Sequence, residues 1–157
     1  MPEELFLAHY AAGHLKVKDI LYYVDSKLAE GLYSDIYIEI LDAIPQDWDE
    51  ISKFFEKLIL EEKKLIPTLE DAAMLILESH VKLITLGEVE PFSQFGKLLS
   101  DIQFYDYYNK SEKYYGDCIG LQNLYARYHE DCATRDEINN WLIEESENWL
   151  TQYSKNH

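Results

Sequence analysis

The sequence has 157 residues, of which 47% are hydrophobic and 28% are charged, and this balance favours neither disorder nor insertion into a membrane. A chain of this length buries roughly 70% of the surface that its unfolded form exposes, which predicts one globular domain over residues 1–157. Thirty acidic residues against fourteen lysines and arginines give a formal charge of -16, which repels nucleic acid and anionic lipid and attracts a basic partner, unless it serves solubility alone.

The first two predicted helices lie at the N-terminus. Pro2 suits the first turn of a helix and Gly13 suits the position just after its end. A second helix is predicted from apolar residues at helical spacing, with Gly31 as its stop, namely Val17, Ile20, Leu21, Val24 and Leu28. The short connection predicts that these two helices form a hairpin.

Two further helices are predicted before Pro67. Ser34 is a plausible cap for a helix with Ile36, Ile40, Leu41 and Ile44 on one face, and Pro45 ends it. Because Tyr37, Ile38 and Ile40 also favour strands, a strand is the alternative there. Asp47 or Asp49 then caps a long helix that ends in the charged run Glu61–Lys64.

The central part of the chain predicts the most buried helix. Thr68 and Asp71 have the spacing of a capping box, and the helix that follows is apolar around much of its circumference before Gly87 stops it. We therefore expect it at the centre of the fold. Pro91 begins another helix, whose inward stripe reaches Ile102.

Two more helices complete an all-α domain of about eight helices, stacked as helical hairpins. Leu121, Leu124, Tyr125 and Tyr128 predict a helix capped by Asp117. Thr134 and Glu137 form a regular capping box for the last helix, which places Ile138, Trp141, Leu142 and Trp149 inward.

Residues 101–117 hold five of the thirteen tyrosines among four acids and only two lysines, Lys110 and Lys113. Such a segment is either a packed connector or a recognition surface, because a phenol combines a rigid apolar face with a polar tip. Carboxylates and tyrosine faces both bind lysine and arginine side chains. The residues predicted to bind a partner are Tyr105, Asp106, Tyr107, Tyr108, Tyr114, Tyr115 and Asp117.

The acidic character continues to the last helix. From Asp101 to Trp149 there are eleven acids against four basic residues. The simplest structural explanation is that the tyrosines pack between helices while the acids cap helix starts or face water. The functional explanation is an acidic interface for a cationic protein.

No catalytic motif or cofactor-binding motif is recognisable, and we expect no enzyme activity and no cofactor. Cys118, His129 and Cys132 are the only clustered metal-ligand candidates, and they lack an evident fourth ligand. Glu78 and His80 do not have the spacing of a di-iron motif, so His80 is predicted to be a core or boundary histidine.

The N-terminal residues are acidic, and their apolar run is too short for a signal peptide. We therefore expect a cytoplasmic protein. Two cysteines are too few for a disulfide framework and are expected as reduced thiols.

The layout resembles the small helical immunity proteins of contact-dependent and related polymorphic toxin systems. The similarity lies in Gly31 and Gly87 as helix stops, in residues 86–92 (LGEVEPF) between two apolar helices, and in residues 116–121 (GDCIGL) leading into an acidic helix. The resemblance implies a cytoplasmic, non-enzymatic protein that binds the C-terminal domain of a cognate toxin, commonly a basic nuclease, and blocks it. Binding residues differ between such pairs, so the resemblance assigns none here.

The leading hypothesis is therefore a toxin-neutralising immunity protein. A helical scaffold or adaptor that docks a partner through an apolar groove is the alternative, and a helical enzyme with a small-molecule or metal site is a third possibility.

Overall fold

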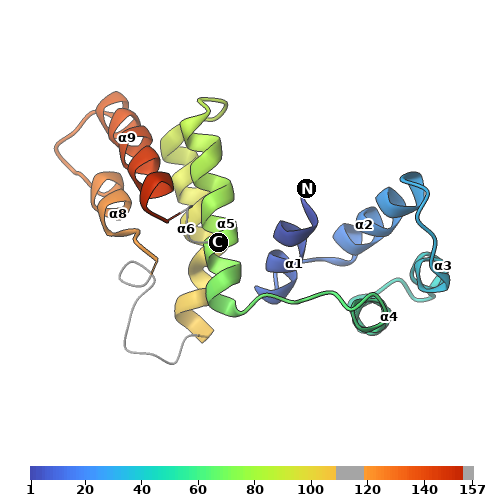
Figure 1. The fold of residues 1–157 in the computed structure, drawn as a ribbon. Coiled ribbons are helices and arrows are strands. Elements are labelled where there is room, and N and C mark those ends of the chain that lie inside the picture. The colour runs from blue at the N-terminus through green and yellow to red at the C-terminus, as the bar shows by residue number, and fades with distance from the viewer. Residues whose placement is uncertain (109–118, 154–157) are drawn as a thin grey trace. The chain divides into compact units, whose positions relative to one another are not determined.

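The computed structural model describes the backbone of residues 1–108 and 119–153 and the side chains of residues 1–105 and 119–153. All regular structure in these ranges is α-helical, which confirms the predicted class and rules out a strand at residues 37–40 (Figure 1). The helices are α1 (Glu3–Ala11), α2 (Val17–Ala29), α3 (Asp35–Asp42), α4 (Trp48–Glu61), α5 (Leu69–Thr85), α6 (Pro91–Tyr108), α8 (Gln122–Tyr128) and α9 (Arg135–Tyr153).

The helices gather into two compact units. One unit consists of Met1–Ala12 together with Pro67–His157, and the other consists of Gly13–Ile66. The second unit is thus inserted into the sequence of the first, between α1 and α5. The sequence analysis had placed helix ends at both junctions but no boundary between units.

Helix α5 is the centre of the first unit, as its apolar circumference predicted. It packs against α1, α6 and α9, and α8 packs against α9 (Figure 1). Ala72, Ala73, Ile76 and Leu77 of α5 are completely buried. Helix α1 belongs to this unit, because it packs against α5 and places Ala8 in the core cluster. The predicted hairpin of α1 with α2 would join the two units and stays a prediction.

The second unit is a three-helix cluster in which α3 and α2 both pack against α4. Its core contains fully buried Ile20, Val24, Ile40 and Phe55, and the ring of Tyr23 meets Phe55 edge-on at 6.1 Å. These apolar residues recur at helical spacing on one face of each helix, so the three stripes bury one another.

Four predicted helix caps are confirmed. The Ser34 hydroxyl accepts a hydrogen bond from the Ile36 N–H at 3.3 Å, and the Asp47 carboxylate accepts one from the Glu50 N–H at 3.1 Å. The Thr68 hydroxyl accepts from the Asp71 N–H at 3.1 Å. The Thr134 hydroxyl accepts from the Glu137 N–H at 3.3 Å, and Glu137 accepts in return from the Thr134 N–H at 2.8 Å.

The predicted cap of α8 is wrong. This helix begins at Gln122, so the cap position is Leu121 and not Asp117. Leu121 is completely buried and has no side-chain oxygen to offer. Its role in the structure is to pack, and the N-terminus of α8 receives no side-chain cap.

Candidate protein-binding site

The tyrosine segment lies largely outside the described residues. Of its predicted contacts, Tyr114, Tyr115 and Asp117 fall in residues 109–118, and the side chains of Asp106, Tyr107 and Tyr108 are also outside the described part. These six stay predictions.

Tyr105 is placed by the structure, and it is buried. Its side chain is 5% exposed and belongs to the same core cluster as Ile102 and Phe104. A partner could not reach this ring without opening the core, so Tyr105 is removed from the proposed contacts. It takes the packing role that the sequence allowed for this segment.

The chain is firmly anchored where the described residues resume at Ile119. The indole N–H of Trp149 donates a hydrogen bond to the Ile119 carbonyl oxygen at 2.8 Å. Trp149 also stacks on Tyr153 at 5.4 Å, and a Cβ at Gly120 would overlap the Tyr153 ring. Gly120 has a φ of 75°, so glycine is required there by both space and conformation.

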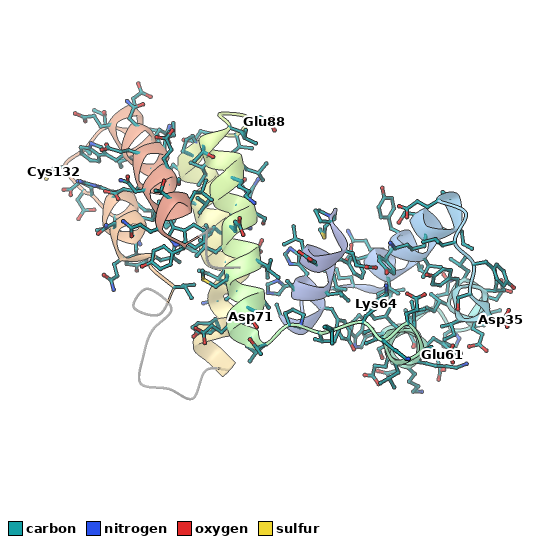
Figure 2. The ribbon with its side chains drawn as sticks, viewed as in Figure 1. Asp35, Glu61, Lys64, Asp71, Glu88 and Cys132 are labelled. Atoms are coloured by element: carbon teal, nitrogen blue, oxygen red, sulfur yellow. The ribbon has the colours of Figure 1, made fainter. Side chains whose placement is uncertain are left out.

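A surface cleft of about 490 Å³ opens between the start of α6, the end of α8 and the start of α9. It is formed within one unit by residues that are distant in the sequence. Its lining residues are Phe92, Tyr128, His129, Glu130, Asp131, Ala133, Arg135 and Ile138. The loop between α8 and α9 forms one wall, and Cys132 in this loop points away from the helices (Figure 2).

The floor of the cleft is aromatic. The rings of Phe92 and Tyr128 stack at 4.3 Å with an interplanar angle of 28°, and Phe95 lies 5.2 Å from Tyr128. Gly96 makes room for this arrangement, because a Cβ at that position would lie 3.2 Å from the Tyr128 hydroxyl oxygen. Since Phe95 is completely buried and lies against Tyr128, the position of Tyr128 is fixed by the core.

The two arginines near the cleft are both held by intramolecular contacts. The Arg135 guanidinium lies over the Phe92 ring, with Cζ 3.4 Å from the ring centre. Arg127 lies over Trp141 at 5.0 Å, and its Nε is 3.6 Å from a carboxylate oxygen of Glu145. Both contacts are cation–π pairs, which bind a guanidinium through the negative face of the ring.

The acids of this region are mostly exposed to water, as Arg135 also is. Between residues 119 and 153, six of the seven acids are exposed: Glu130, Asp131, Asp136, Glu137, Glu144 and Glu147. The seventh, Glu145, is the partner of Arg127. The solvent-facing charge around the cleft is therefore predominantly negative.

Hydrogen bonds at two helix starts fix the shape of the cleft. The Phe92 N–H donates to the side-chain oxygen of Asn139 at 3.0 Å, which ties the start of α6 to α9. The Ser93 N–H donates to Glu90 at 2.7 Å, and the hydrogen bonds from Ser93 are the main cause that lowers the pKa of Glu90, with Arg135 contributing. Hydrogen bonds from Thr134 likewise lower the pKa of Glu137.

The metal-ligand candidates do not come together in the described structure. His129 lies against the rings of Tyr125 and Tyr128 at 4.4 and 4.9 Å, Cys132 is an exposed free thiol, and Cys118 lies outside the described residues. Over residues whose side chains are described, no group of three or more His, Cys, Asp and Glu side chains could hold a metal ion.

His80 is a core histidine, as predicted. It is 8% exposed and bridges α5 and α6, with Nδ1 2.7 Å from the Gln94 amide nitrogen and Nε2 2.9 Å from an Asp101 carboxylate oxygen. The amide donates to Nδ1, so the ring proton is on Nε2 and is donated to Asp101. Burial lowers the pKa of His80, and Asp101 opposes that effect.

Sequence reasoning identified the acids of the cleft but not the cleft itself. Glu130 and Asp131 are among the eleven acids counted from Asp101 to Trp149, whereas Tyr128 was predicted only as part of a helix and Phe92 only at the start of one. The two rings are 36 positions apart, and no local spacing reveals that they stack. The available signal was the concentration of acids in residues 130–137, next to two aromatic-rich helices.

Comparison with protein-family models, with curated proteins and with solved structures finds no match for this chain. None of the helices that the structure describes has the length and apolarity needed to cross a membrane.

Proposed function

We propose that this protein binds a basic protein partner and neutralises it, in the manner of the immunity proteins that its sequence resembles. The partner is the C-terminal domain of a cognate toxin, which the protein occludes in the cytoplasm without catalysing a reaction. The observation that carries the proposal is the distribution of charge around the cleft: the acids face water, while Arg127 and Arg135 are engaged on aromatic rings.

Charge of this sign has a direct effect on association. Exposed acids raise the encounter rate with a cationic protein. This effect weakens with salt, because exposed charges that are more than about 10 Å apart are largely screened at 0.1 M ionic strength. Aromatic groups that lose water on binding supply most of the affinity in such interfaces. The cleft offers partly buried Phe92 and Tyr128, and the predicted contacts Tyr107, Tyr108, Tyr114 and Tyr115 add further rings if they are accessible.

The proposal is tested by co-purification with the C-terminal domain encoded by the neighbouring upstream reading frame, followed by titration at 50 and 500 mM salt. The expected result is a stable complex whose association rate falls at high salt. A matched variant, Glu144→Gln with Glu147→Gln, should slow association without changing the fold. The absence of a complex at either salt concentration would contradict the proposal.

One observation favours the adaptor alternative. Nine of the thirteen large apolar side chains that are exposed in the described residues lie in the Gly13–Ile66 unit, and Ile44 and Leu65 are 94% and 90% exposed. The nine are Tyr22, Leu32, Tyr33, Ile38, Ile44, Trp48, Leu60, Leu65 and Ile66. A partner that docks on this unit would bind with little dependence on salt, and substitution of Ile44 by Asp would weaken it.

A further inference from the structure

We infer that the outer face of α3, with the turn at each of its ends, is a docking surface for a basic protein that carries an apolar groove. This surface, the α3 face, consists of the exposed side chains of residues 32–49. The inference rests on the proposed function for the identity of the partner. It adds the place of contact and the chemistry of the surface that binds there.

Helix α3 has one covered side and one open side. Its buried residues, Ile36, Tyr37 and Ile40, lie on the side that packs against α2 and α4. The other side is exposed along the whole helix, because four residues at helical spacing are all exposed there. They are Asp35, Ile38, Glu39 and Asp42.

Large apolar side chains gather on the α3 face. Residues 32–48 hold five of the thirteen that are exposed in the described residues, namely Leu32, Tyr33, Ile38, Ile44 and Trp48. An eight-residue helix is about 12 Å long, so its two ends fit within the roughly 800 Å² that one partner buries in a standard interface. Tyr33 is 71% and Ile44 94% exposed, so both protrude and require a concave apolar partner.

Both turns of the α3 face are held by their own hydrogen bonds. The Tyr33 hydroxyl donates to the Asp35 carboxylate at 3.0 Å, and the Gln46 side-chain amide donates to the Leu41 carbonyl oxygen at 2.8 Å. Asp47 caps the start of α4. The exposed side chains are therefore presented on a formed backbone, which lowers the ordering cost of binding.

The charge around these apolar groups selects the partner. Residues 28–52 contain seven acids and no lysine or arginine. Lysines of the adjoining helices pair with three of these acids, at Glu30, Glu39 and Glu50. Within the described structure no ion pair involves the other four, Asp35, Asp42, Asp47 and Asp49. Such a surface repels a second copy of this chain, nucleic acid and anionic lipid, and it attracts a basic protein.

The adaptor alternative uses the same apolar groups without the charge. It predicts that neutralising the aspartates has no effect and that salt changes little. The two interpretations are therefore separated by Asp42→Asn with Asp49→Asn. Neither carboxylate caps a helix or pairs with a cation in the described part of the chain, so this double variant leaves the fold intact.

The experiment is an NMR titration of the full-length protein with an amphipathic helical peptide of leucine and lysine, and with the leucine–glutamate peptide of equal length as its anionic control. We expect the lysine peptide to shift amide signals in residues 32–49 and the glutamate peptide to leave them in place. Tyr33→Ala and Ile44→Ala should each weaken binding about fivefold, and the double aspartate variant about threefold at 50 mM salt.

Matched controls come from the other unit. Leu86→Ala removes a side chain that is 66% exposed, and Glu70→Gln with Glu88→Gln removes the same charge as the aspartate pair, with Glu70 second in α5 as Asp49 is second in α4. Both should have a smaller effect than the α3-face variants, and circular dichroism establishes that each variant is folded. Shifts spread over all exposed acids, equal shifts with the glutamate peptide, or unchanged binding by Ile44→Ala would overturn the inference.

The same variants separate this inference from the proposed function. Neutralisation of the upstream C-terminal domain by Tyr33→Ala with Ile44→Ala at the wild-type level would refute the docking surface and leave the proposed function standing. Binding of the lysine peptide at the α3 face, with no complex between the wild-type protein and the upstream domain, would refute the proposed function and leave the docking surface standing.

Discussion

Gly120 should be the glycine whose replacement destabilises the fold most, because it combines a positive φ with close contact to a ring. Its φ is 75°, and an added Cβ would overlap the Tyr153 ring. Gly87 has a nearly equal φ of 68°, but a Cβ added there would meet nothing within 4 Å, so this position isolates the conformational cost. Alanine in this region of φ costs roughly 1–2 kcal/mol, which is the destabilisation expected for Gly87→Ala.

Gly120→Ala carries an additional cost. Tyr153 must leave its place, which disrupts its stacking on Trp149, and such aromatic pairs contribute about 0.5–1.5 kcal/mol beyond the area they bury. The free energy of unfolding should therefore fall by about 1.5–3.5 kcal/mol, the sum of the conformational cost and the lost ring contacts.

Urea unfolding followed by circular dichroism measures these values, and a double-mutant cycle separates the two causes. In the Tyr153→Ala background the ring is absent, so Gly120→Ala should cost only the amount measured for Gly87→Ala. An equal cost of Gly120→Ala with and without the ring would refute the reasoning. The result matters for function because Gly120 and Ile119 anchor the C-terminal end of the tyrosine segment.

Three further predictions concern polar groups around the core. Burial lowers the pKa of His80, so this ring binds a proton more readily in the unfolded chain than in the folded one. The stability that depends on the neutral ring is therefore fully present above about pH 6.5. It is lost as the pH falls from there through the pKa of the folded state. His80→Gln should cost about 1–3 kcal/mol at pH 7.5 and should flatten the pH dependence of urea unfolding between pH 5 and 7. A His80 variant with the wild-type slope would contradict this. Ser146→Ala should raise the free energy of unfolding by about 1 kcal/mol, because the Ser146 hydroxyl is completely buried with no hydrogen-bond partner in the described structure. A loss of stability in this variant would show that the hydroxyl does have a hydrogen-bond partner. Asn139→Ala leaves the Phe92 N–H without its acceptor and should cost about 1 kcal/mol in the same assay, an expectation that an unchanged midpoint would disprove.

The features that sequence predicted well are local. Each confirmed cap joins residues two or three positions apart, as in Ser34 with Ile36 or Thr134 with Glu137, so the residue spacing determines the contact. The position of α5 was also predictable, because a helix that is apolar around most of its circumference needs neighbours on several sides.

Pairing between distant helices was not predictable in this way. Helix α1 is compatible with any apolar neighbour, and its packing against α5, about sixty positions further along the chain, is not visible in local spacing. The stacking of Phe92 on Tyr128 likewise joins residues of two helices that are distant in the sequence, so no local spacing predicts it.

Burial of Tyr105, however, was contained in the sequence. Phe95, Leu98, Ile102 and Tyr105 follow one another at spacings of three, four and three, which continues the inward stripe of α6 by one more turn. The sequence analysis ended that stripe at Ile102 and assigned Tyr105 to the recognition segment. Helical periodicity was the stronger signal, and the tyrosine-rich composition concealed it.

The central claim, that this protein neutralises a cationic toxin domain, is tested most directly by growth of cells that express the upstream C-terminal domain. Co-expression of the wild-type protein should restore growth, and the Glu130→Gln, Asp131→Asn variant, expressed at the same level, should restore it less. Growth arrest that persists in the presence of abundant, folded wild-type protein would contradict the account.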